Sequence, residues 1–197
     1  MGSLELIIGP MFAGKSCELF RKIRILKVLN KLYLVIKPSI DTREPIDIIT
    51  SHNFDKEACF ILTNLKDIYN TIEKNYFDNI DTILIDEGQF FNDLKETVLE
   101  LVEKYNKNII ISGLDGDFNR NTFGQLLDLI PYSDRCIKLS AMCLKCKDGT
   151  PGIFSHRINI SDNQICIGAS DKYISVCRKH YIELKNLNNG YYIKEFA

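Results

Sequence analysis

Apolar residues follow two alternating patterns along the first two thirds of the chain. Short continuous runs, typical of buried strands, cover residues 4–8, 32–36, 82–85 and 109–111. Between them, apolar residues recur every three or four positions, as in amphipathic helices, over residues 19–30, 65–72 and 93–105. Strands that are apolar on both faces and alternate with helices predict an α/β fold with a mainly parallel sheet flanked by helices.

Polar residues predict where some of these elements begin and end. Pro38 is expected to stop the second strand, because proline cannot donate a backbone hydrogen bond to a sheet. The residues that follow, 39–56, are polar without a clear period, which predicts a loop. Asp93 and Glu96 have the spacing of a capping box, so the helix over 93–105 is expected to begin there.

The pattern changes after about residue 137, where long helical periodicity ends and cysteines become frequent. Short extended pieces at 152–160 and 164–168 precede a helical segment at 181–187. We therefore predict two domains, an α/β domain over residues 1–137 and a smaller domain over residues 138–197.

Composition and charge narrow the class of protein. The chain is 45% hydrophobic with a mean hydropathy of -0.09, as in ordinary globular proteins. Its apolar runs are shorter than the roughly 18 residues of a membrane span, and its first residues lack the basic segment of a signal peptide. A net charge of -1 argues against bulk electrostatic binding of nucleic acid. Seven cysteines without a secretory signal indicate a reducing compartment, so a cytoplasmic location is expected.

A glycine-rich segment lies between the first predicted strand and the first predicted helix. It matches the pattern G-x-x-x-x-G-K followed by Ser or Thr, in which backbone N–H groups and a helix N-terminus bind phosphate. Lys15 is expected to reach the β- and γ-phosphates, and the Ser16 hydroxyl to bind Mg²⁺. A glycine-rich turn without a ligand is the alternative. The candidate phosphate-binding residues are Gly9, Pro10, Met11, Phe12, Ala13, Gly14, Lys15 and Ser16.

Two acidic residues follow the buried strand at 82–85. An acid at this strand end positions Mg²⁺ in P-loop proteins, which suits Asp86. Glu87 beside it can act as a general base, toward a substrate hydroxyl in a kinase or toward water in an ATPase. The alternative is a strand end whose acidic residues face solvent.

Cysteine and histidine pairs in the second domain have the spacing of metal ligands. Cys143 and Cys146 form one C-x-x-C pair, and Cys177 with His180 forms a second. Four such ligands fit a closed, structural zinc site in a ribbon-like domain. A redox C-x-x-C motif, the competing interpretation, does not require the second pair. The remaining cysteines, Cys17, Cys59, Cys136 and Cys166, are expected to be buried or half-buried.

Five segments, in order from about residue 4 to residue 180, match motifs of one family. Residues 9–16 resemble G-P-M-F-(S/A)-G-K-(S/T), and residues 37–43 resemble K-P-x-x-D-x-R. Residues 86–91, DEGQFF, resemble D-E-(G/A)-Q-F-F, and residues 113–124 resemble G-L-D-x-x-F-x-x-x-x-F-G. Residues 169–178 resemble the segment before the family's last zinc ligands. The chain thus resembles the thymidine kinases of the P-loop, zinc-containing type, both cellular and viral.

The resemblance implies roles for residues around the phosphates. Glu87 corresponds to the proton acceptor for the 5′-hydroxyl of thymidine. The resemblance also places four further residues at the nucleotide and magnesium site. These are Asp41, Arg43, Asp86 and Gln89.

The resemblance also implies a pocket for the base. Its apolar walls are Met11, Phe90, Leu114, Phe118, Phe123 and Tyr173, for which ordinary core packing is the alternative. A loop that covers the substrate holds the base mainly through backbone atoms. This loop consists of Gln164, Ile165, Cys166, Ile167 and Gly168. Because the cysteine and histidine pairs bracket residues 147–176, zinc is expected to support this loop rather than the phosphate loop.

The implied activity is transfer of the γ-phosphate of ATP to the 5′-hydroxyl of thymidine, with deoxyuridine as a further substrate, for DNA precursor synthesis. The resemblance further implies Mg²⁺, structural Zn²⁺, a homotetramer and feedback inhibition by thymidine triphosphate. A P-loop ATPase with a zinc ribbon acting on nucleic acid is a second hypothesis, and a non-catalytic nucleotide-binding module is a third. ATP consumption that depends on thymidine, on nucleic acid or on neither distinguishes the three.

Overall fold

The larger part of the chain forms one six-stranded sheet in which every pair of neighbouring strands is parallel. The structure is a computed structural model that describes residues 1–42, 47–50, 55–158 and 172–188. The strand order is β5-β2-β6-β7-β1-β8. The bounds are β1 Ser3–Gly9, β2 Tyr33–Pro38, β5 Phe60–Leu62, β6 Thr82–Ile85, β7 Asn108–Leu114 and β8 Arg135–Lys138.

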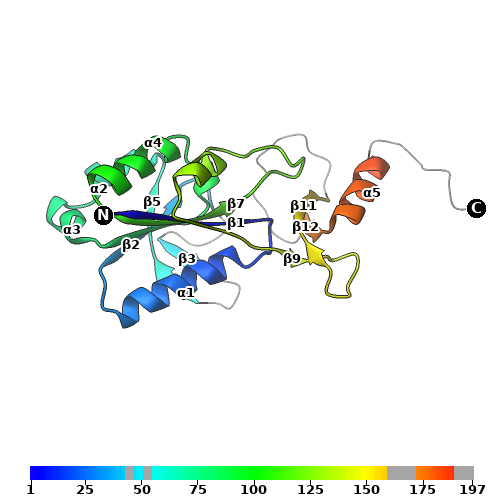
Figure 1. Cartoon of the computed structure of the whole chain (residues 1–197), viewed down its shortest axis with the longest axis horizontal. Helices are drawn as coiled ribbons and strands as arrows, with labels where there is room; N and C mark the ends of the chain where they lie inside the picture. The colour runs from blue at the N-terminus through cyan, green and yellow to red at the C-terminus, as the bar shows by residue number, and fades with distance from the viewer. Residues whose placement is uncertain (43–46, 51–54, 159–171, 189–197) are drawn as a thin grey trace, which may run out of the picture.

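Helices cover both faces of this sheet (Figure 1). Helix α1, Lys15–Val28, packs on one face, while α2 (Ile68–Thr71), α3 (Lys74–Asn79) and α4 (Leu94–Leu99) lie on the other. The π-helical turn η3, Glu100–Lys104, continues α4, and three short 3₁₀ helices connect other elements. The 3₁₀ helices are η1 Leu65–Asp67, η2 Gly88–Phe90 and η4 Leu126–Tyr132.

Alternation along the strands supplies the two cores. Leu6 and Ile8 of β1 point to the core beneath α2 to α4, whereas Ile7 joins Leu19 and Ile23 of α1 on the opposite side. All of these side chains are buried, which explains why the strands are apolar on both faces. The predicted α/β class and the mainly parallel sheet are confirmed.

Several element boundaries differ from those predicted. Helix α1 begins at Lys15 and ends at Val28, and Asn30 has a left-handed φ of 52°. Within the polar segment predicted as a loop, β3 (Ile48–Thr50) pairs antiparallel with β4 (Lys56–Ala58). The sequence pattern also did not predict β5 or α3. These elements are too short to show a period and depend on tertiary contacts.

The predicted capping box at Asp93 is wrong. Its carboxylate makes no capping hydrogen bond to α4. Instead it accepts the backbone N–H groups of Leu65 and Lys66, both at 2.9 Å. Asp93 therefore caps the start of η1, a neighbouring element, because those N–H groups would otherwise be unpaired.

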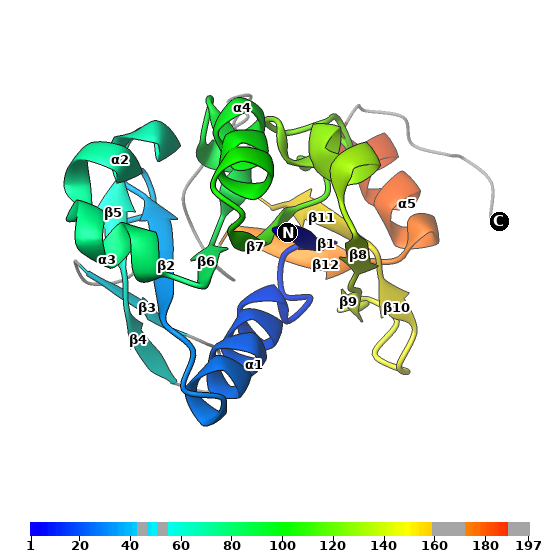
Figure 2. The ribbon, with the colours of Figure 1, turned by 60° about the vertical axis from the view of Figure 1, so that its left-hand side comes forward.

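A smaller unit follows the last strand of the sheet. Strands β9 (Ala141–Met142) and β10 (Pro151–Gly152) pair antiparallel, as do β11 (Phe154–Arg157) and β12 (Tyr173–Val176). Helix α5, Arg178–Asn188, confirms the helical segment predicted there. In Figure 2 this unit lies beside β1 and β8. The division at residue 137 stays a prediction, and the predicted piece at 164–168 lies outside the described residues.

No helix in the described part of the chain is both long enough and apolar enough to cross a membrane.

Candidate functional site

The carboxyl ends of the parallel strands bring most of the described candidate residues to one edge of the sheet. At this edge β1 ends at Gly9, β2 at Pro38, β6 at Ile85 and β7 at Leu114. Ligands of open α/β sheets bind at this edge. Asp41, after β2, lies in a turn in which its N–H donates to the Pro38 carbonyl at 3.0 Å.

The glycine-rich segment forms a tight loop between β1 and α1. Gly14 has a left-handed φ of 81° and is the N-cap residue of α1. Because glycine has no side chain, it cannot cap the N–H groups of the first helical turn. Open N–H groups at a helix N-terminus favour an anion. Lys15 is only 9% exposed, and its Nζ donates to the Pro10 carbonyl at 2.8 Å. The described geometry of the loop is compatible with the predicted phosphate binding, which stays a prediction.

A buried hydrogen-bond network follows β6. The Ser112 hydroxyl on β7 and the Glu87 N–H both donate to Oδ1 of Asp86, the latter at 3.1 Å. Gln89 Nε2 donates to Oε2 of Glu87 at 2.6 Å. The N–H of Leu114 in turn donates to Oε1 of Gln89 at 3.1 Å. These contacts fix the orientation of both carboxylates at the sheet edge.

Ser112 was not predicted as a site residue. Its signal was present in the sequence, because a hydroxyl inside the apolar strand β7 needs a buried partner. Gly124 is a second residue near the site that was not predicted. It has a left-handed φ of 61°, and a Cβ added there would lie 2.0 Å from the Gln89 carbonyl oxygen. Glycine at this position allows the chain to pass close to Gln89.

Aromatic candidates lie in two groups. Phe90 and Phe123 meet edge to face, with ring centroids 5.3 Å apart. The Phe118 ring lies under the guanidinium of Arg157, whose carbon is 3.8 Å from the ring centroid. Arg157 also donates to the Tyr173 hydroxyl, from Nε at 3.1 Å and from Nη2 at 2.5 Å. Arg157 was not predicted from the sequence.

A hydrogen bond joins the glycine-rich loop to the smaller unit. The backbone N–H of Met11 donates to the hydroxyl of Ser155 on β11 at 2.9 Å. Met11, within the loop, therefore contacts the unit that carries Tyr173. Two parts of the predicted site, Arg43 and the loop at 164–168, lie outside the described residues.

The two predicted metal-binding pairs converge. His180 Nδ1 lies 3.5 Å from the sulfur of Cys143 and 3.4 Å from the sulfurs of Cys146 and Cys177. The sulfurs of Cys146 and Cys177 are 3.8 Å apart. Tetrahedral zinc, with bonds of about 2.3 Å to sulfur and about 2.0 Å to nitrogen, requires spacings of about 3.8 Å between sulfurs and about 3.5 Å between sulfur and nitrogen.

These spacings match the zinc geometry, so the residues fit a closed zinc site. Binding through Nδ1 leaves Nε2 of His180 facing Glu183, whose carboxylate oxygen is 3.8 Å away. A carboxylate that hydrogen-bonds to a histidine ligand fixes the ring, but the 3.8 Å separation here is longer than a hydrogen bond. Glu183 had not been singled out from the sequence.

The remaining cysteines differ in exposure. Cys59 is buried, and burial raises the pKa of its thiol to about 11. Cys17 is half-buried, as expected. Cys136 is exposed on the edge strand β8, contrary to the prediction. Cys166 lies outside the described residues.

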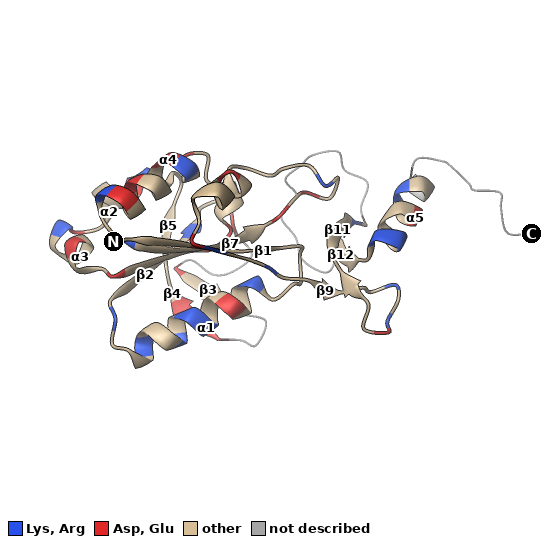
Figure 3. Ribbon diagram, in the orientation of Figure 1, with Lys and Arg blue, Asp and Glu red and all other residues tan. Residues whose placement is uncertain are grey.

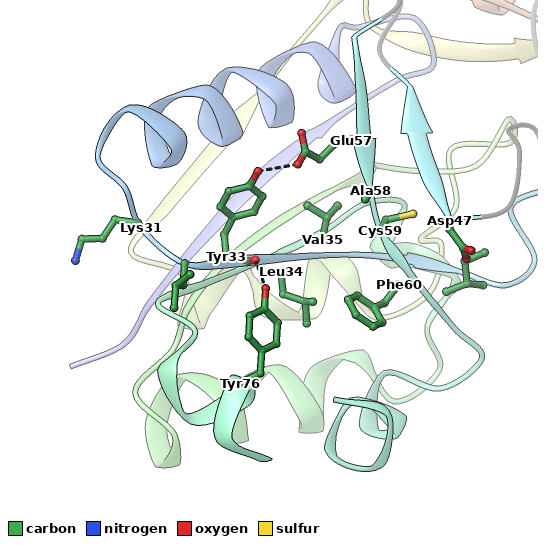
Figure 4. A pocket seen from close by; sticks show the side chains of 12 residues that line it. Lys31, Tyr33, Leu34, Val35, Asp47, Glu57, Ala58, Cys59, Phe60 and Tyr76 are labelled. Carbon is green, nitrogen blue, oxygen red and sulfur yellow. Dashed lines mark hydrogen bonds between the residues drawn. The ribbon is translucent and has the colours of Figure 1, made fainter. Parts of the chain in front are cut away.

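A cavity of about 710 Å³ lies between β2, β4 and β5 (Figure 4). Tyr33, Phe60 and Tyr76 contribute to its walls, and the Tyr33 hydroxyl donates to Oε1 of Glu57 at 2.7 Å. No described candidate residue lines this cavity. It is therefore separate from the site at the carboxyl edge of the sheet.

Comparison with known proteins identifies the family. The family model described as thymidine kinase matches residues 2–181 of the chain. The chain belongs to the thymidine kinase family. Thymidine kinase a of Arabidopsis thaliana is 38% identical over 181 residues, which cover 92% of this chain and 75% of the relative.

Other relatives in the thymidine kinase family come from distant organisms. Thymidine kinase 1 of Dictyostelium discoideum is 39% identical over 193 residues, covering 96% of this chain and 82% of the relative. The thymidine kinase of vaccinia virus is 39% identical over 183 residues, covering 92% of this chain and 98% of the relative. Membership of the thymidine kinase family makes this protein a kinase, and hence a transferase.

Proposed function

We propose that the protein transfers the γ-phosphate of ATP to the 5′-hydroxyl of thymidine, giving thymidine monophosphate and ADP for nucleotide salvage. Deoxyuridine, which lacks only the thymine methyl group, is proposed as a second substrate. The observation that carries the proposal is the network in which Gln89 holds Glu87 beside Asp86, at the sheet edge that also carries the phosphate loop. The names of the relatives support thymidine as the acceptor.

The phosphate loop is proposed to bind ATP. Backbone N–H groups at residues 9–16 would hold the β- and γ-phosphates, and the Lys15 ammonium would stabilise negative charge as the γ-phosphoryl group moves. The Ser16 hydroxyl and the Asp86 carboxylate are oxygen donors of the kind that Mg²⁺ prefers. When bound there, Mg²⁺ would supply positive charge to the phosphate oxygens.

Glu87 is proposed as the general base. Its carboxylate would accept the proton of the 5′-hydroxyl while that oxygen forms a bond to the γ-phosphorus. The bond from the γ-phosphorus to the bridging oxygen breaks, and ADP leaves with the electron pair. Gln89 would keep the carboxylate aimed at the hydroxyl, since its amide already donates to Oε2. Asp41 and Arg43 are assigned to the phosphates on the family resemblance.

The base is proposed to bind between the aromatic groups. Phe118 and Tyr173 would form one wall and Phe90 with Phe123 another, with Leu114 and Met11 nearby. The five residues 164–168 would cover the base through their backbone atoms. Flat apolar walls with few polar groups suit a nucleobase.

Structural zinc is proposed at the cluster of three cysteines and one histidine, where it would hold the base-binding segment in place. From the family resemblance we also propose a cytoplasmic homotetramer that thymidine triphosphate inhibits. Light scattering of the purified protein tests the first property, and inhibition kinetics test the second.

A coupled assay of ATP consumption tests the proposed reaction. Turnover should require thymidine, proceed with deoxyuridine and be slow with deoxycytidine. Consumption that depends on DNA or RNA instead would indicate a nucleic-acid-dependent ATPase. The structure offers little support for that alternative, because basic residues of α1 (Figure 3) pair with carboxylates instead of forming an unpaired cationic stripe. Arg21 pairs with Glu18 and Lys27 pairs with Glu57, both at 2.6 Å.

A further inference from the structure

Phe118, a proposed wall of the base pocket, is held at two points by the smaller unit. The Arg157 guanidinium stacks on its ring at 3.8 Å. The Tyr181 hydroxyl donates to its backbone carbonyl at 2.8 Å. Arg157 is 4% exposed and Tyr181 is 1% exposed, so both contacts are shielded from water. One contact fixes the ring and the other fixes the backbone.

Arg157 also connects Phe118 to the opposite side of the same wall. While the face of its guanidinium covers the Phe118 ring, its edge donates two hydrogen bonds to the Tyr173 hydroxyl. A planar guanidinium can stack and donate at once, whereas a lysine ammonium cannot. Burying a charged group is costly, and an apolar side chain would fill the same space without that cost. The arrangement is therefore better suited to fixing two aromatic rings than to packing alone.

Tyr181 connects this wall to the metal cluster. It follows His180 directly in α5, and its ring packs against Phe154 with centroids 5.2 Å apart. The loop that carries Phe118 is itself fixed by Asp117, whose Oδ1 accepts the N–H groups of Asn119 and Asn121, both at 2.8 Å. A shift of α5 would thus be passed to the Phe118 backbone.

We propose that Arg157 and Tyr181 are positioning residues for the nucleoside base. They set the place of Phe118 relative to Tyr173, so that the pocket is preformed before thymidine binds. The inference rests on the proposed function, because it deepens the assignment of this wall to the base. Neither residue takes part in phosphoryl transfer. A preformed wall lowers the entropic cost of binding, so its loss raises the KM for thymidine and leaves the KM for ATP unchanged.

The test compares two conservative variants with a matched control. Tyr181→Phe removes one hydroxyl and keeps the ring, and Arg157→Lys keeps the charge and loses the stacked fork. Arg178→Gln is the control, because Arg178 is exposed and its guanidinium also lies over a ring of this unit, 5.0 Å from the centroid of Phe154. Zinc content and thermal unfolding are measured for every variant, together with kcat and both KM values.

We expect Tyr181→Phe to raise the KM for thymidine about 5-fold, the equivalent of one net hydrogen bond, with zinc retained. Arg157→Lys should raise it about 10-fold or more, since a stacked cation and two charge-assisted hydrogen bonds are lost. The KM for ATP should stay within about 2-fold in both variants, and Arg178→Gln should behave as wild type. Unchanged thymidine KM, or equal increases for both substrates, would overturn the proposal.

Phe118→Ala separates this inference from the proposed function. If Phe118→Ala leaves the thymidine KM unchanged, the base pocket itself is misplaced. If it raises that KM while Tyr181→Phe and Arg157→Lys do not, the pocket stands and the positioning role fails. If Arg157→Lys loses zinc or unfolds, a double-mutant cycle decides the question. It compares the double variant Phe118→Leu/Tyr181→Phe with its two single variants. Additive effects on thymidine KM in that cycle would count against the positioning role.

Discussion

The parallel sheet and the smaller unit are stabilised in different ways. The sheet packs against two extensive apolar cores, in which strands β1, β2 and β6 contribute side chains to both faces. Among the residues of the smaller unit that the structure describes, one buried apolar cluster is formed by Cys143, Val176 and Tyr181, and Cys143 also belongs to the cysteine and histidine cluster. So small a core provides little stability. Zinc bound at the proposed site would therefore supply in the smaller unit part of the stability that apolar burial supplies in the sheet.

The two regions nevertheless meet at the site. Ser155 accepts the N–H of Met11 in the phosphate loop, and Tyr181 donates to the carbonyl of Phe118. The smaller unit therefore contacts residues proposed for both substrates. Substitutions in each region test how far the two act separately.

Replacing Lys15 should abolish activity without unfolding the sheet. Lys15→Ala removes the fixed cation proposed to face the transferring phosphoryl group, and we expect kcat/KM to fall by about 10³-fold or more. Circular dichroism should show a folded protein, because the side chain bonds to its own loop. Lys27→Ala, in the same helix but paired with Glu57 on the surface, is the control. Loss of fold in Lys15→Ala alone would show that this lysine is structural.

Replacing Glu87 should affect the chemical step alone. In Glu87→Gln the amide oxygen can still accept the hydrogen bond from Gln89, so the local geometry is kept while the base is lost. We expect kcat to fall about 10²-fold, with binding of both substrates nearly unchanged. Single-turnover kinetics and equilibrium titrations measure the two quantities separately. Glu96→Gln, an exposed carboxylate of α4, is the control, and a Glu87→Gln enzyme with most of its kcat would remove Glu87 from this role.

Removing one metal ligand should affect thymidine more than ATP. We expect Cys146→Ser to lose zinc and to raise the KM for thymidine about 10-fold, because the unit carrying Tyr173 and Tyr181 loses its constraint. The hydrogen bond between Met11 and Ser155 passes a smaller effect to the phosphate loop, so ATP affinity should fall by no more than about 3-fold.

Metal analysis followed by separate titrations of the two substrates checks this result. Cys136→Ser, which changes an exposed cysteine outside the metal cluster, should retain zinc and both affinities. Zinc-free wild-type protein with full thymidine affinity would contradict the prediction. Equal loss of both affinities would mean that the smaller unit supports the whole fold.

The features that a short stretch of sequence determines could be predicted. The strand at Thr82–Ile85 and the turn before α1 were predicted because an apolar run and a continuous motif specify them. Phosphate binding by that turn stays a prediction. The metal cluster was predicted for a similar reason, since four ligands in two spaced pairs have few other uses. The fold class followed from the alternation of strands and helices.

Features that depend on distant contacts were missed. Asp93 caps η1 rather than its own helix because Leu65 and Lys66, nearly thirty positions earlier, come to lie beside it. Arg157 gave no signal, since an arginine in a short strand is usually solvated, and only the approach of Phe118 and Tyr173 gives it a role. Long-range contacts of this kind override local propensity.

The last and smallest effect concerns pH and the stability of the smaller unit. The structure buries His156 against the Tyr181 ring, with centroids 6.1 Å apart. Burial, and secondarily the positive charge of Lys145, lowers the pKa of its imidazole below the ordinary value. The unfolded chain, with a histidine pKa of about 6.5, then binds more protons than the folded chain in the window below pH 6.5. His156 therefore contributes stability above that pH, and the contribution is lost as the pH falls toward the folded-state pKa.

Comparing wild type with His156→Gln separates this contribution from protonation of the proposed zinc ligands, which occurs in both proteins. As the pH is lowered from about 7.5 to about 5.5, we expect the melting temperature of wild type to fall more than that of His156→Gln, because only wild type must bury a charged ring. Differential scanning calorimetry at constant ionic strength measures the shift. A melting-temperature difference that stays constant across this range would show that His156 is solvated enough to protonate in the folded protein. The smaller unit would then not depend on the neutral form of this histidine.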